Sequence, residues 1–321
     1  MRIEEFIHTV NEYTIKGIPF LFVIDFEKEK PFVSKIEDLE KENVLYSIKN
    51  KGNLTSKRNK KTIPLKIDVI DKAMYTNAFD KVKSNIIQGN SYLTNLTFPT
   101  NIEVDIHLKT IIEKAKAKYK IFFKNEFISF SPESFIQIKK NKIYTFPMKG
   151  TIDADIPNAE NKLLEDKKEI YEHNTIVDLM RNDLAMVATN IKINRFRYLE
   201  KIKTSKGNIL QASSEIEGVL SKNWKMNFGE LVLKLLPAGS ISGAPKVKTV
   251  EIIQQAEKQK RGYYTGIFGV FDGENVDSAV LIRYIENREK GLIYQSGGGI
   301  TSQSNLDFEY AEMIQKIYIP I

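Results

Sequence analysis

A ladder of β-hairpins between residues 120 and 150 constrains the fold more than any other feature of this chain. The stretch "KIFFKNEFISFSPESFIQIKKNKIYTFPMKG" alternates short apolar runs with the turns "KNE", "SPE" and "KKNK". Such runs predict antiparallel strands, because parallel neighbours would need a long crossover between them. Hairpins of this kind, mixed with helices, indicate an α+β architecture rather than alternating βαβ units.

Helices and strands are predicted on both sides of this ladder. Helical patterns lie at 1–16, 71–88, 106–119, 159–188, 226–236 and 305–318. Strand-like segments lie at 18–26, 44–48, 91–98, 191–219, 263–272, 276–286 and 291–296. We expect a turn in the Gly-rich segment 296–301, and a loop at 238–245 that opens a helix near Pro245. No internal repeat or low-complexity linker divides the chain.

Length and composition exclude several classes of protein. The 321 residues, 42% of them hydrophobic, are enough for one large domain or two ordinary ones. No cysteine is present, which excludes disulfides, thiolate metal sites and cysteine catalysis within this chain. The longest apolar run, "IPFLFVIDF" at 18–26, is too short to span a bilayer. We expect a soluble, cytoplasmic protein with no membrane partner.

The net charge of +7 is compatible with nucleic-acid binding. However, arginines are few, and the lysines are scattered among glutamates. The one dense basic cluster, "KNKGNLTSKRNKK" at 49–61, lacks the interleaved aromatic residues of a surface that binds single strands. It is typical of a solvated, mobile loop. We therefore expect no nucleic-acid partner.

Two pairs of glutamates share one spacing on two predicted helices. Glu169 and Glu172 are three residues apart, as are Glu309 and Glu312, so each pair projects from one helix face. Like charges at this spacing repel and need a cation or free solvation. Mg²⁺ suits such carboxylates because it accepts their oxygens and keeps waters for a substrate. His173 directly follows Glu172 and is expected to flank this site; exposed helix faces are the other interpretation of both pairs.

Other residues could bind an anion. The segments 296–301 ("SGGGIT") and 238–245 ("AGSISGAP") offer backbone N–H groups without large side chains, although neither matches a nucleotide motif. Arg283 lies in a strand-like segment, where it needs either a ligand or a salt bridge to a neighbouring strand. Tyr264 could supply a hydroxyl group or belong to the core. Lys149, in the bend "FPMKGT", is either a solvated loop charge or an amine directed into a pocket.

Seven segments occur in an order that resembles the chorismate-utilising enzymes. They are "SPESF", "FPMKGT", "EIYEHNTIVDLMRNDL", "LLPAGSISGAPK", "RGYYTGIFGVFD", "SAVLIR" and "SGGGIT…DFEYAEMIQK". This family includes anthranilate synthase component I, isochorismate and salicylate synthases, and aminodeoxychorismate synthase component I. The resemblance implies antiparallel sheets packed as a sandwich core with helices outside. It also implies a catalytic domain at 66–321, with residues 1–65 as a shortened N-terminal region packed on it.

Lys149 is the residue that discriminates within this family. The other synthases typically carry alanine there, whereas "PMKGT" is similar to the Pro-Ile-Lys-Gly-Thr motif of aminodeoxychorismate synthases. The resemblance implies that the amine of Lys149 attacks C2 of chorismate while the C4 hydroxyl leaves, with Glu133 as general acid. Ammonia then enters at C4 and expels the lysine. An attacking amine must be neutral, so we expect burial or a nearby cation to depress its pKa.

The resemblance assigns further residues to the site. It implies Mg²⁺ on Glu172, Glu309 and Glu312, with Glu169 nearby, and a substrate pocket formed by Gly150, Thr151, Tyr264, Arg283, Gly298, Asn95 and His173. Asn95 is chosen because Leu93 stands where the family usually has a polar residue. His173 is shared with anthranilate synthases, and some aminodeoxychorismate synthases have asparagine instead.

The absence of cysteine bears on the source of ammonia. A class I glutaminase needs a cysteine nucleophile, so ammonia must be free or come from a separate glutamine amidotransferase subunit. The resemblance implies the latter, in para-aminobenzoate and folate biosynthesis. The shortened N-terminal region makes a regulatory tryptophan site unexpected. Two alternatives remain: anthranilate synthase component I, and a catalytically silent chorismate-family binding protein.

Overall fold

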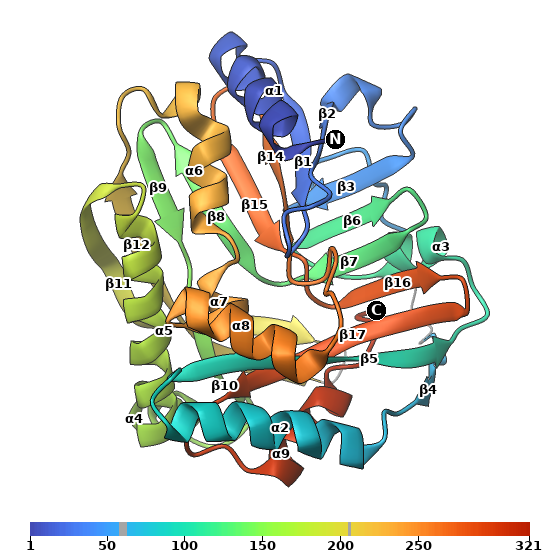
Figure 1. The fold of residues 1–321 in the computed structure, drawn as a ribbon, viewed down its shortest axis with the longest axis vertical. Helices are drawn as coiled ribbons and strands as arrows, with labels where there is room; N and C mark the ends of the chain where they lie inside the picture. Colours follow the sequence, from blue (N-terminus) through green and yellow to red (C-terminus); the bar gives the residue numbers. More distant parts are fainter. Residues whose placement is uncertain (58–62, 205–206) are drawn as a thin grey trace.

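The structure of the protein, a computed structural model, describes residues 1–57, 63–204 and 207–321. In these ranges two antiparallel sheets pack together and helices cover them (Figure 1). The helices are α1 (Ile3–Lys16), α2 (Lys72–Ile87), α3 (Leu108–Lys114), α4 (Ala159–Glu165), α5 (Lys167–Ala185), α6 (Phe228–Leu235), α7 (Gly239–Ser242), α8 (Lys246–Glu257) and α9 (Leu306–Gln315). The expected α+β sandwich with outer helices is confirmed.

Sheet A has the strand order β10-β12-β9-β8-β15-β14-β1-β2, with β11 paired to β12. Its strands are β1 (Phe20–Ile24), β2 (Phe32–Lys35), β8 (Ser134–Lys139), β9 (Lys142–Thr145), β10 (Met148–Asp153), β11 (Thr189–Thr204), β12 (Gly207–Val219), β14 (Ile267–Phe271) and β15 (Val276–Val280). The hairpins predicted from the sequence supply β8, β9 and β10, three neighbours along the chain.

Sheet B has the strand order β13-β5-β17-β16-β7-β6-β3, with β4 paired to β5. Its strands are β3 (Val44–Ile48), β4 (Lys66–Asp68), β5 (Leu93–Glu103), β6 (Tyr119–Phe123), β7 (Phe127–Ser131), β13 (Gly243–Ala244), β16 (Tyr284–Arg288) and β17 (Gly291–Ile300). The hairpin ladder therefore crosses from sheet B to sheet A between β7 and β8, at the turn "SPE".

Strand β1 shows how the two sheets share a core. Successive side chains of a strand point to opposite faces, and here both faces are buried. Phe20, Phe22 and Ile24 pack in the cluster that includes α1, α5 and α6, whereas Leu21 and Val23 pack against β3, β6 and β7 of sheet B. The unbroken apolar run is explained by this position between two layers.

The first 65 residues supply strands to both sheets. β1 pairs with β14, and β3 pairs with β6, both of which follow residue 65 in the chain. The boundary expected at that residue stays a prediction. None of the helices in the described part of the chain combines the length and the hydropathy needed to cross a bilayer.

The residues predicted as one strand at 276–286 form two strands in different sheets. β15 belongs to sheet A and β16 to sheet B. Between them Arg283 adopts a positive φ of 52°. That bend was invisible in the alternation of the sequence, because a left-handed residue between two apolar runs leaves the pattern almost unchanged. It brings Arg283 to the junction of the sheets.

The Gly-rich segment is part of β17 and not a turn. Gly297 lies opposite Thr97 of β5, and Gly299 lies opposite Asn95. A Cβ atom on Gly297 would come within 2.3 Å of the carbonyl oxygen of Leu96, so the glycine permits a close approach of the two strands. The predicted turn is therefore wrong, and so is the anion nest based on it, because this backbone runs in a sheet ladder.

The helix predicted at 159–188 is two helices, α4 and α5. Asp166 between them has an extended backbone (φ −62°, ψ 112°), and its side chain accepts a hydrogen bond of 3.1 Å from the backbone N–H of Glu169. Aspartate is a strong N-cap because it satisfies a backbone donor at the helix start. The break places Glu169 in the first turn of α5.

Part of the predicted basic loop is well packed. Asn53 bonds the backbone of β3 at Tyr46 and Val44, at 2.8 and 3.0 Å, and Leu54 is buried. Residues 58–62, which carry much of its charge, lie outside the described residues. Among residues 49–57, Asn53 and Leu54 pack against β3, whereas the other seven residues are exposed, as expected for a solvated segment.

Candidate active site

A cavity of about 240 Å³ brings together six of the residues predicted for the site. Its walls come from β5, β10, β17, α7 and the loops before β8, β14 and β16. The six predicted residues in these walls are Asn95, Glu133, Lys149, Tyr264, Arg283 and Gly298. A larger cavity of about 820 Å³ between β3, β8, β9, β14 and β15 contains none of the predicted residues among those described. The smaller cavity is the candidate active site because of the side chains in its walls and not because of its size.

Lys149 is directed by an irregularity in β10. The pairing of β10 with β12 shifts register between Met148 and Thr151, and Gly150 has a φ of 87°, which glycine adopts without strain. A Cβ atom on Gly150 would lie 3.0 Å from a carboxylate oxygen of Glu169. The bulge thus lets Lys149 project into the cavity, while Thr151 beyond it is exposed. Neither Gly150 nor Thr151 is part of the cavity wall as described, contrary to expectation.

The amine of Lys149 is held by a carboxylate. Its Nζ lies 3.0 Å from Oε2 of Glu172, and its side chain is 34% exposed. Burial lowers the pKa of Lys149, but the charge and hydrogen bond of Glu172, with Glu312 and Glu169 farther away, outweigh burial and raise it. In this structure the pKa of Lys149 is therefore raised and not depressed as expected.

His173 lies behind Lys149 and not in the cavity wall. The ring is fully buried, with Nδ1 3.3 Å from the carbonyl oxygen of Lys149 and Nε2 2.7 Å from Oγ of Ser214. Because a carbonyl only accepts, Nδ1 must donate, and Nε2 accepts from the hydroxyl of Ser214. Burial lowers the pKa of His173, consistent with this neutral form. His173 therefore holds the backbone of Lys149 and does not reach the space where a substrate would lie.

Glu133 occupies the turn where the chain crosses between the sheets. The hydroxyl of Ser240, on α7, donates a hydrogen bond to its carboxylate. Burial raises the pKa of Glu133, while the hydrogen bond from Ser240 and the charges of Arg283 and Lys149 oppose the rise. A carboxyl group with a raised pKa, in the same cavity as an amine, can serve as a proton donor.

Arg283 presents an unpaired donor. Its Nε is buried and has no hydrogen-bond partner, and its guanidinium lies 5.5 Å from the centre of the Tyr318 ring. No ion pair joins it to a carboxylate in the described residues, so a structural salt bridge to a neighbouring strand is wrong. Tyr264 is almost fully buried in the same wall. The two side chains are placed to meet an anionic group of a ligand.

The four predicted glutamates lie on two helices, Glu169 and Glu172 on α5 and Glu309 and Glu312 on α9, and charges from both pairs act on Lys149. A Cβ atom on Gly298, which faces them from β17, would lie 3.4 Å from Oε2 of Glu309 and 3.9 Å from Oε1 of Glu312. Burial, assisted by Glu172, raises the pKa of Glu169. Burial also raises that of Glu309, where Glu312 adds to the rise and a hydrogen bond from a serine opposes it. Within each pair, the charge of one carboxylate therefore adds to the rise in the pKa of the other.

The donor chemistry of this cluster fits Mg²⁺, which prefers carboxylate oxygens. In residues 1–57, 63–204 and 207–321, however, no group of three or more such side chains is arranged to hold an ion. Two of the carboxylates form ion pairs with lysines: Glu172 contacts Lys149 and Lys168, and Glu312 lies 2.7 Å from Lys316. Side-chain rotation away from these lysines would be needed for metal binding.

The sequence matches the profile described as chorismate binding enzyme over residues 7–321. The chain belongs to this family. A relative from Haemophilus influenzae, a PabA-like protein, is 50% identical over 99% of this chain and 97% of its own length. Aminodeoxychorismate synthase component 1 of Bacillus subtilis is 30% identical over 76% of this chain and 54% of its own length. The resemblance drawn from the seven segments is confirmed.

Solved structures show the same fold. Anthranilate synthase component I from Streptococcus pneumoniae matches with a TM-score of 0.69 and 24% identity, over 81% of this chain and 60% of its own. The menaquinone-specific isochorismate synthase of Escherichia coli matches with a TM-score of 0.73 and 14% identity, over 98% and 80%. At these identities the likeness concerns the chorismate-enzyme fold alone.

Two of the cavity residues that were not predicted, Lys316 and Ser240, contact predicted glutamates. Lys316 lies in the cavity wall, where Nζ donates to the carbonyl oxygen of Gly297 at 2.9 Å and contacts Glu312 at 2.7 Å; burial lowers its pKa. Its place four residues after Glu312 on one helix is a signal that could have found it. Ser240 was less accessible to prediction, because its contact with Glu133 joins segments 107 residues apart.

Proposed function

We propose that this protein is aminodeoxychorismate synthase component I, which converts chorismate and ammonia to 4-amino-4-deoxychorismate. The observation that carries the proposal is the amine of Lys149 in one cavity with the carboxyl group of Glu133 and the unpaired guanidinium donor of Arg283. The relative from Bacillus subtilis that bears this name supports it.

The first step forms a bond between Nζ of Lys149 and C2 of chorismate. The ring double bonds shift, and the C4–O bond breaks. Before attack the ammonium must lose a proton to solvent, and its 3.0 Å contact with Glu172 must open. Because His173 holds the carbonyl group of Lys149, the amine swings from a backbone that is fixed.

Glu133 supplies the proton for the leaving hydroxyl group. Hydroxide is a poor leaving group, so proton transfer from an acid lowers the barrier. The raised pKa of Glu133 favours the protonated form that the step requires. Water leaves, and the carboxylate that remains is stabilised by the hydroxyl of Ser240.

Ammonia completes the exchange. Its nitrogen bonds to C4, the double bonds shift back, and the C2–Nζ bond breaks to release Lys149 as an amine. The proton lost by the incoming nitrogen returns Glu133 to its acid form. Chorismate and ammonia thus yield aminodeoxychorismate and water, and the lysine is regenerated. Arg283 and Tyr264 bind a substrate carboxylate in this scheme, with Asn95 and Gly298 beside the ring.

Mg²⁺ is proposed as the cofactor, held by Glu172, Glu309 and Glu312, with Glu169 behind them. When bound, it would supply positive charge for a substrate carboxylate and for carboxylates that now rest on lysines. In the absence of that charge, Glu172 keeps Lys149 protonated. This arrangement supports coupling between metal binding and the state of the amine.

Removal of the metal should abolish turnover. We expect no product in EDTA and full recovery when excess Mg²⁺ is added. Glu169→Gln should raise the Mg²⁺ concentration for half-maximal rate by about 10–100-fold, the usual effect of losing a group behind the metal ligands. Glu160→Gln, an exposed change on neighbouring α4, should leave that concentration unchanged. Undiminished turnover in EDTA would contradict the metal assignment.

The ammonia source is proposed to be a separate glutamine amidotransferase subunit, because no cysteine is available in this chain for glutamine hydrolysis. The product would then serve para-aminobenzoate and folate biosynthesis in the cytoplasm. Free ammonia at high pH should replace the partner in the test tube.

Product analysis tests the proposal. The purified protein is incubated with chorismate, Mg²⁺ and an ammonium salt at alkaline pH, and products are separated and weighed by liquid chromatography and mass spectrometry. Aminodeoxychorismate is the expected product. Anthranilate would assign the protein to the sister enzyme, with which it shares His173. No product, even with an amidotransferase present, would indicate a silent binding protein.

A further inference from the structure

A buried arginine outside the cavity connects three of its walls. Arg261, in the loop between α8 and β14, is 3% exposed and is not part of the cavity wall. Its guanidinium stacks 4.7 Å from the ring centre of Phe26 and forms an ion pair with Glu257, whose side chain is fully buried. A charged pair buried this completely is costly unless every donor finds an acceptor.

Each of the five N–H donors of this guanidinium has an acceptor. Nε and one N–H of Nη2 donate to the carboxylate of Glu257, at 3.0 and 2.6 Å. The other N–H of Nη2 donates to the carbonyl oxygen of Asn95 at 2.7 Å. Nη1 donates to the carbonyl oxygen of Ile241 at 3.1 Å and to the hydroxyl of Thr265 at 3.3 Å. A planar fork with five donors is a property of arginine that lysine cannot reproduce.

The last three of these acceptors belong to the cavity walls. Asn95 lies on β5, Ile241 on α7, and Thr265 directly follows Tyr264; all of them face the cavity. The network continues on its far side, where the carboxylate of Glu257 accepts from the backbone N–H and the hydroxyl of Thr97, at 2.9 and 3.0 Å. One side chain therefore ties three segments that are otherwise distant in the sequence.

Thr265 carries backbone strain at this junction. Its φ is 60°, which is unusual for a β-branched residue and persists only where surrounding contacts enforce it. The hydroxyl of Thr265 donates to the carbonyl oxygen of Tyr264 at 2.6 Å and accepts from Arg261. The hydroxyl of Thr265 is thus hydrogen-bonded directly to the carbonyl group of Tyr264 and, at the same time, to the guanidinium of Arg261.

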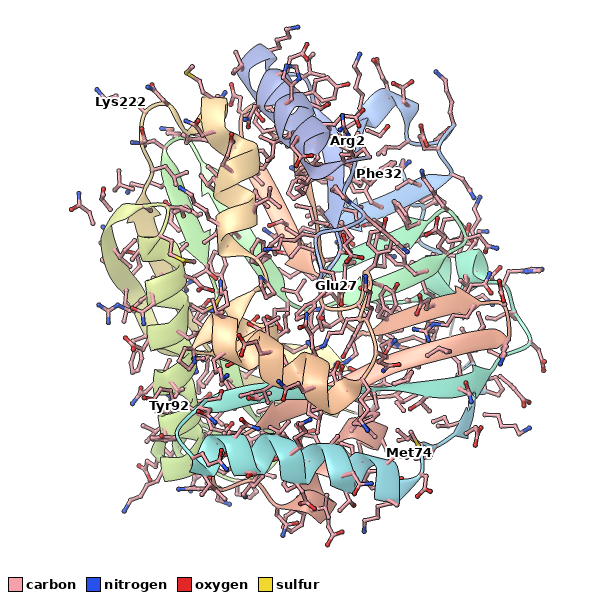
Figure 2. All side chains as sticks on the ribbon, viewed as in Figure 1. Arg2, Glu27, Phe32, Met74, Tyr92 and Lys222 are labelled. Atoms are coloured by element: carbon pink, nitrogen blue, oxygen red, sulfur yellow. The ribbon has the colours of Figure 1, made fainter. Side chains whose placement is uncertain are left out.

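The loop of Arg261 is itself clamped. The carboxylate of Glu27 accepts from the backbone N–H groups of Arg261 and Gly262, at 2.9 and 3.0 Å. Figure 2 shows Glu27 near the centre of the molecule, in the loop that follows β1. Glu27, in the N-terminal region, therefore fixes the backbone of Arg261, while the side chain of Arg261 bonds the cavity walls.

We propose that Arg261 is a positioning residue, which sets the relative placement of Asn95, Ile241 and Tyr264 and thereby the affinity of the site for its anionic substrate. The inference rests on chorismate binding in this cavity, but it is independent of the reaction that follows. A purely structural role would lower the folded fraction and leave the affinity of the folded molecules unchanged.

The test uses the full chain with Mg²⁺ and measures three quantities: the Kd for chorismate by calorimetric titration, KM and kcat for the product that the wild type forms, and the melting temperature. Arg261→Lys keeps the charge but loses at least two donors. We expect its Kd and KM to rise about ten-fold, the scale of losing about 1.4 kcal/mol of binding free energy.

Two further variants separate positioning from folding. Thr265→Gly relieves the positive φ, so its melting temperature should not fall, yet Kd and KM should rise because the hydroxyl link to Arg261 is lost. Thr265→Ser keeps the hydroxyl and should lie closer to wild type. Lys258→Gly is the matched control: it relieves a φ of 54° at an exposed position after α8, and should leave Kd and KM unchanged.

Unchanged Kd and KM in both Arg261→Lys and Thr265→Gly would overturn the inference, whatever their melting temperatures. A wild type that binds chorismate but makes no aminodeoxychorismate would refute the proposed function alone, because the positioning effect is still read from Kd. A wild type that fails to bind chorismate would overturn both.

Discussion

Replacing Lys149 by alanine should lower the rate of aminodeoxychorismate formation on the order of 10⁴-fold or more, the scale of losing a covalent nucleophile. The reason is local: after this change Lys316 is the one amine left in the described cavity wall, and it is held by Glu312 and the carbonyl oxygen of Gly297. Chorismate should still bind, because Arg283 and Tyr264 are untouched.

A matched control and a second readout sharpen this result. Lys168 also contacts Glu172, at 3.7 Å, but is 67% exposed and lies outside the cavity wall. Lys168→Ala should therefore lose less than about ten-fold in rate, as expected for an exposed ion pair. Intact-mass analysis without ammonia should show wild-type protein heavier by chorismate less water, and no such adduct on Lys149→Ala. Substantial turnover by Lys149→Ala would refute the covalent route.

Replacing Glu133 by glutamine should cost about 10²–10⁴-fold in rate, the usual contribution of a general acid. Glutamine retains the shape and can accept the hydrogen bond from Ser240, so the fold and the Kd for chorismate should persist. What it lacks is the acidic proton for the departing hydroxyl group. Rates are measured under saturating chorismate and ammonium, beside the binding titration.

The control for this change is Glu126→Gln, an exposed glutamate in the preceding hairpin turn. It should leave the rate within about two-fold, as exposed substitutions usually do. If Glu133→Gln turned over at the wild-type rate, the acid would have to be another group, and the raised pKa of Glu133 would reflect burial without function.

Much of the fold was readable from the sequence because its signals are local. The hairpin turns, the doubly buried run of β1 and the start of α8 after Pro245 follow from residue spacing and backbone preferences within a few positions. The motifs around Lys149 and the glutamate pairs on α5 and α9 were also readable, since each is a short pattern. Their order along the chain was enough to indicate the family.

Other features depend on contacts between distant segments. The bend at Arg283 divides one apparent strand between two sheets, and the Gly-rich segment becomes a strand because β5 lies beside it. His173 turned out to support the backbone of Lys149, and Ser240 reached Glu133 across 107 positions. No periodicity in the chain encodes these pairings.

By itself, then, the sequence determined most of the types of element and the family, and it singled out Lys149 as the candidate nucleophile, because periodicity and motifs act over a few residues. The tertiary structure alone decided which side chains meet. Glu172 raises the pKa of Lys149, whereas the sequence predicted a lowered one. Arg261 joins three cavity walls through acceptors up to 166 positions away in the chain. The physical reason is that charge, burial and hydrogen bonding depend on distance in space, which is set only when both sheets and their helices have packed.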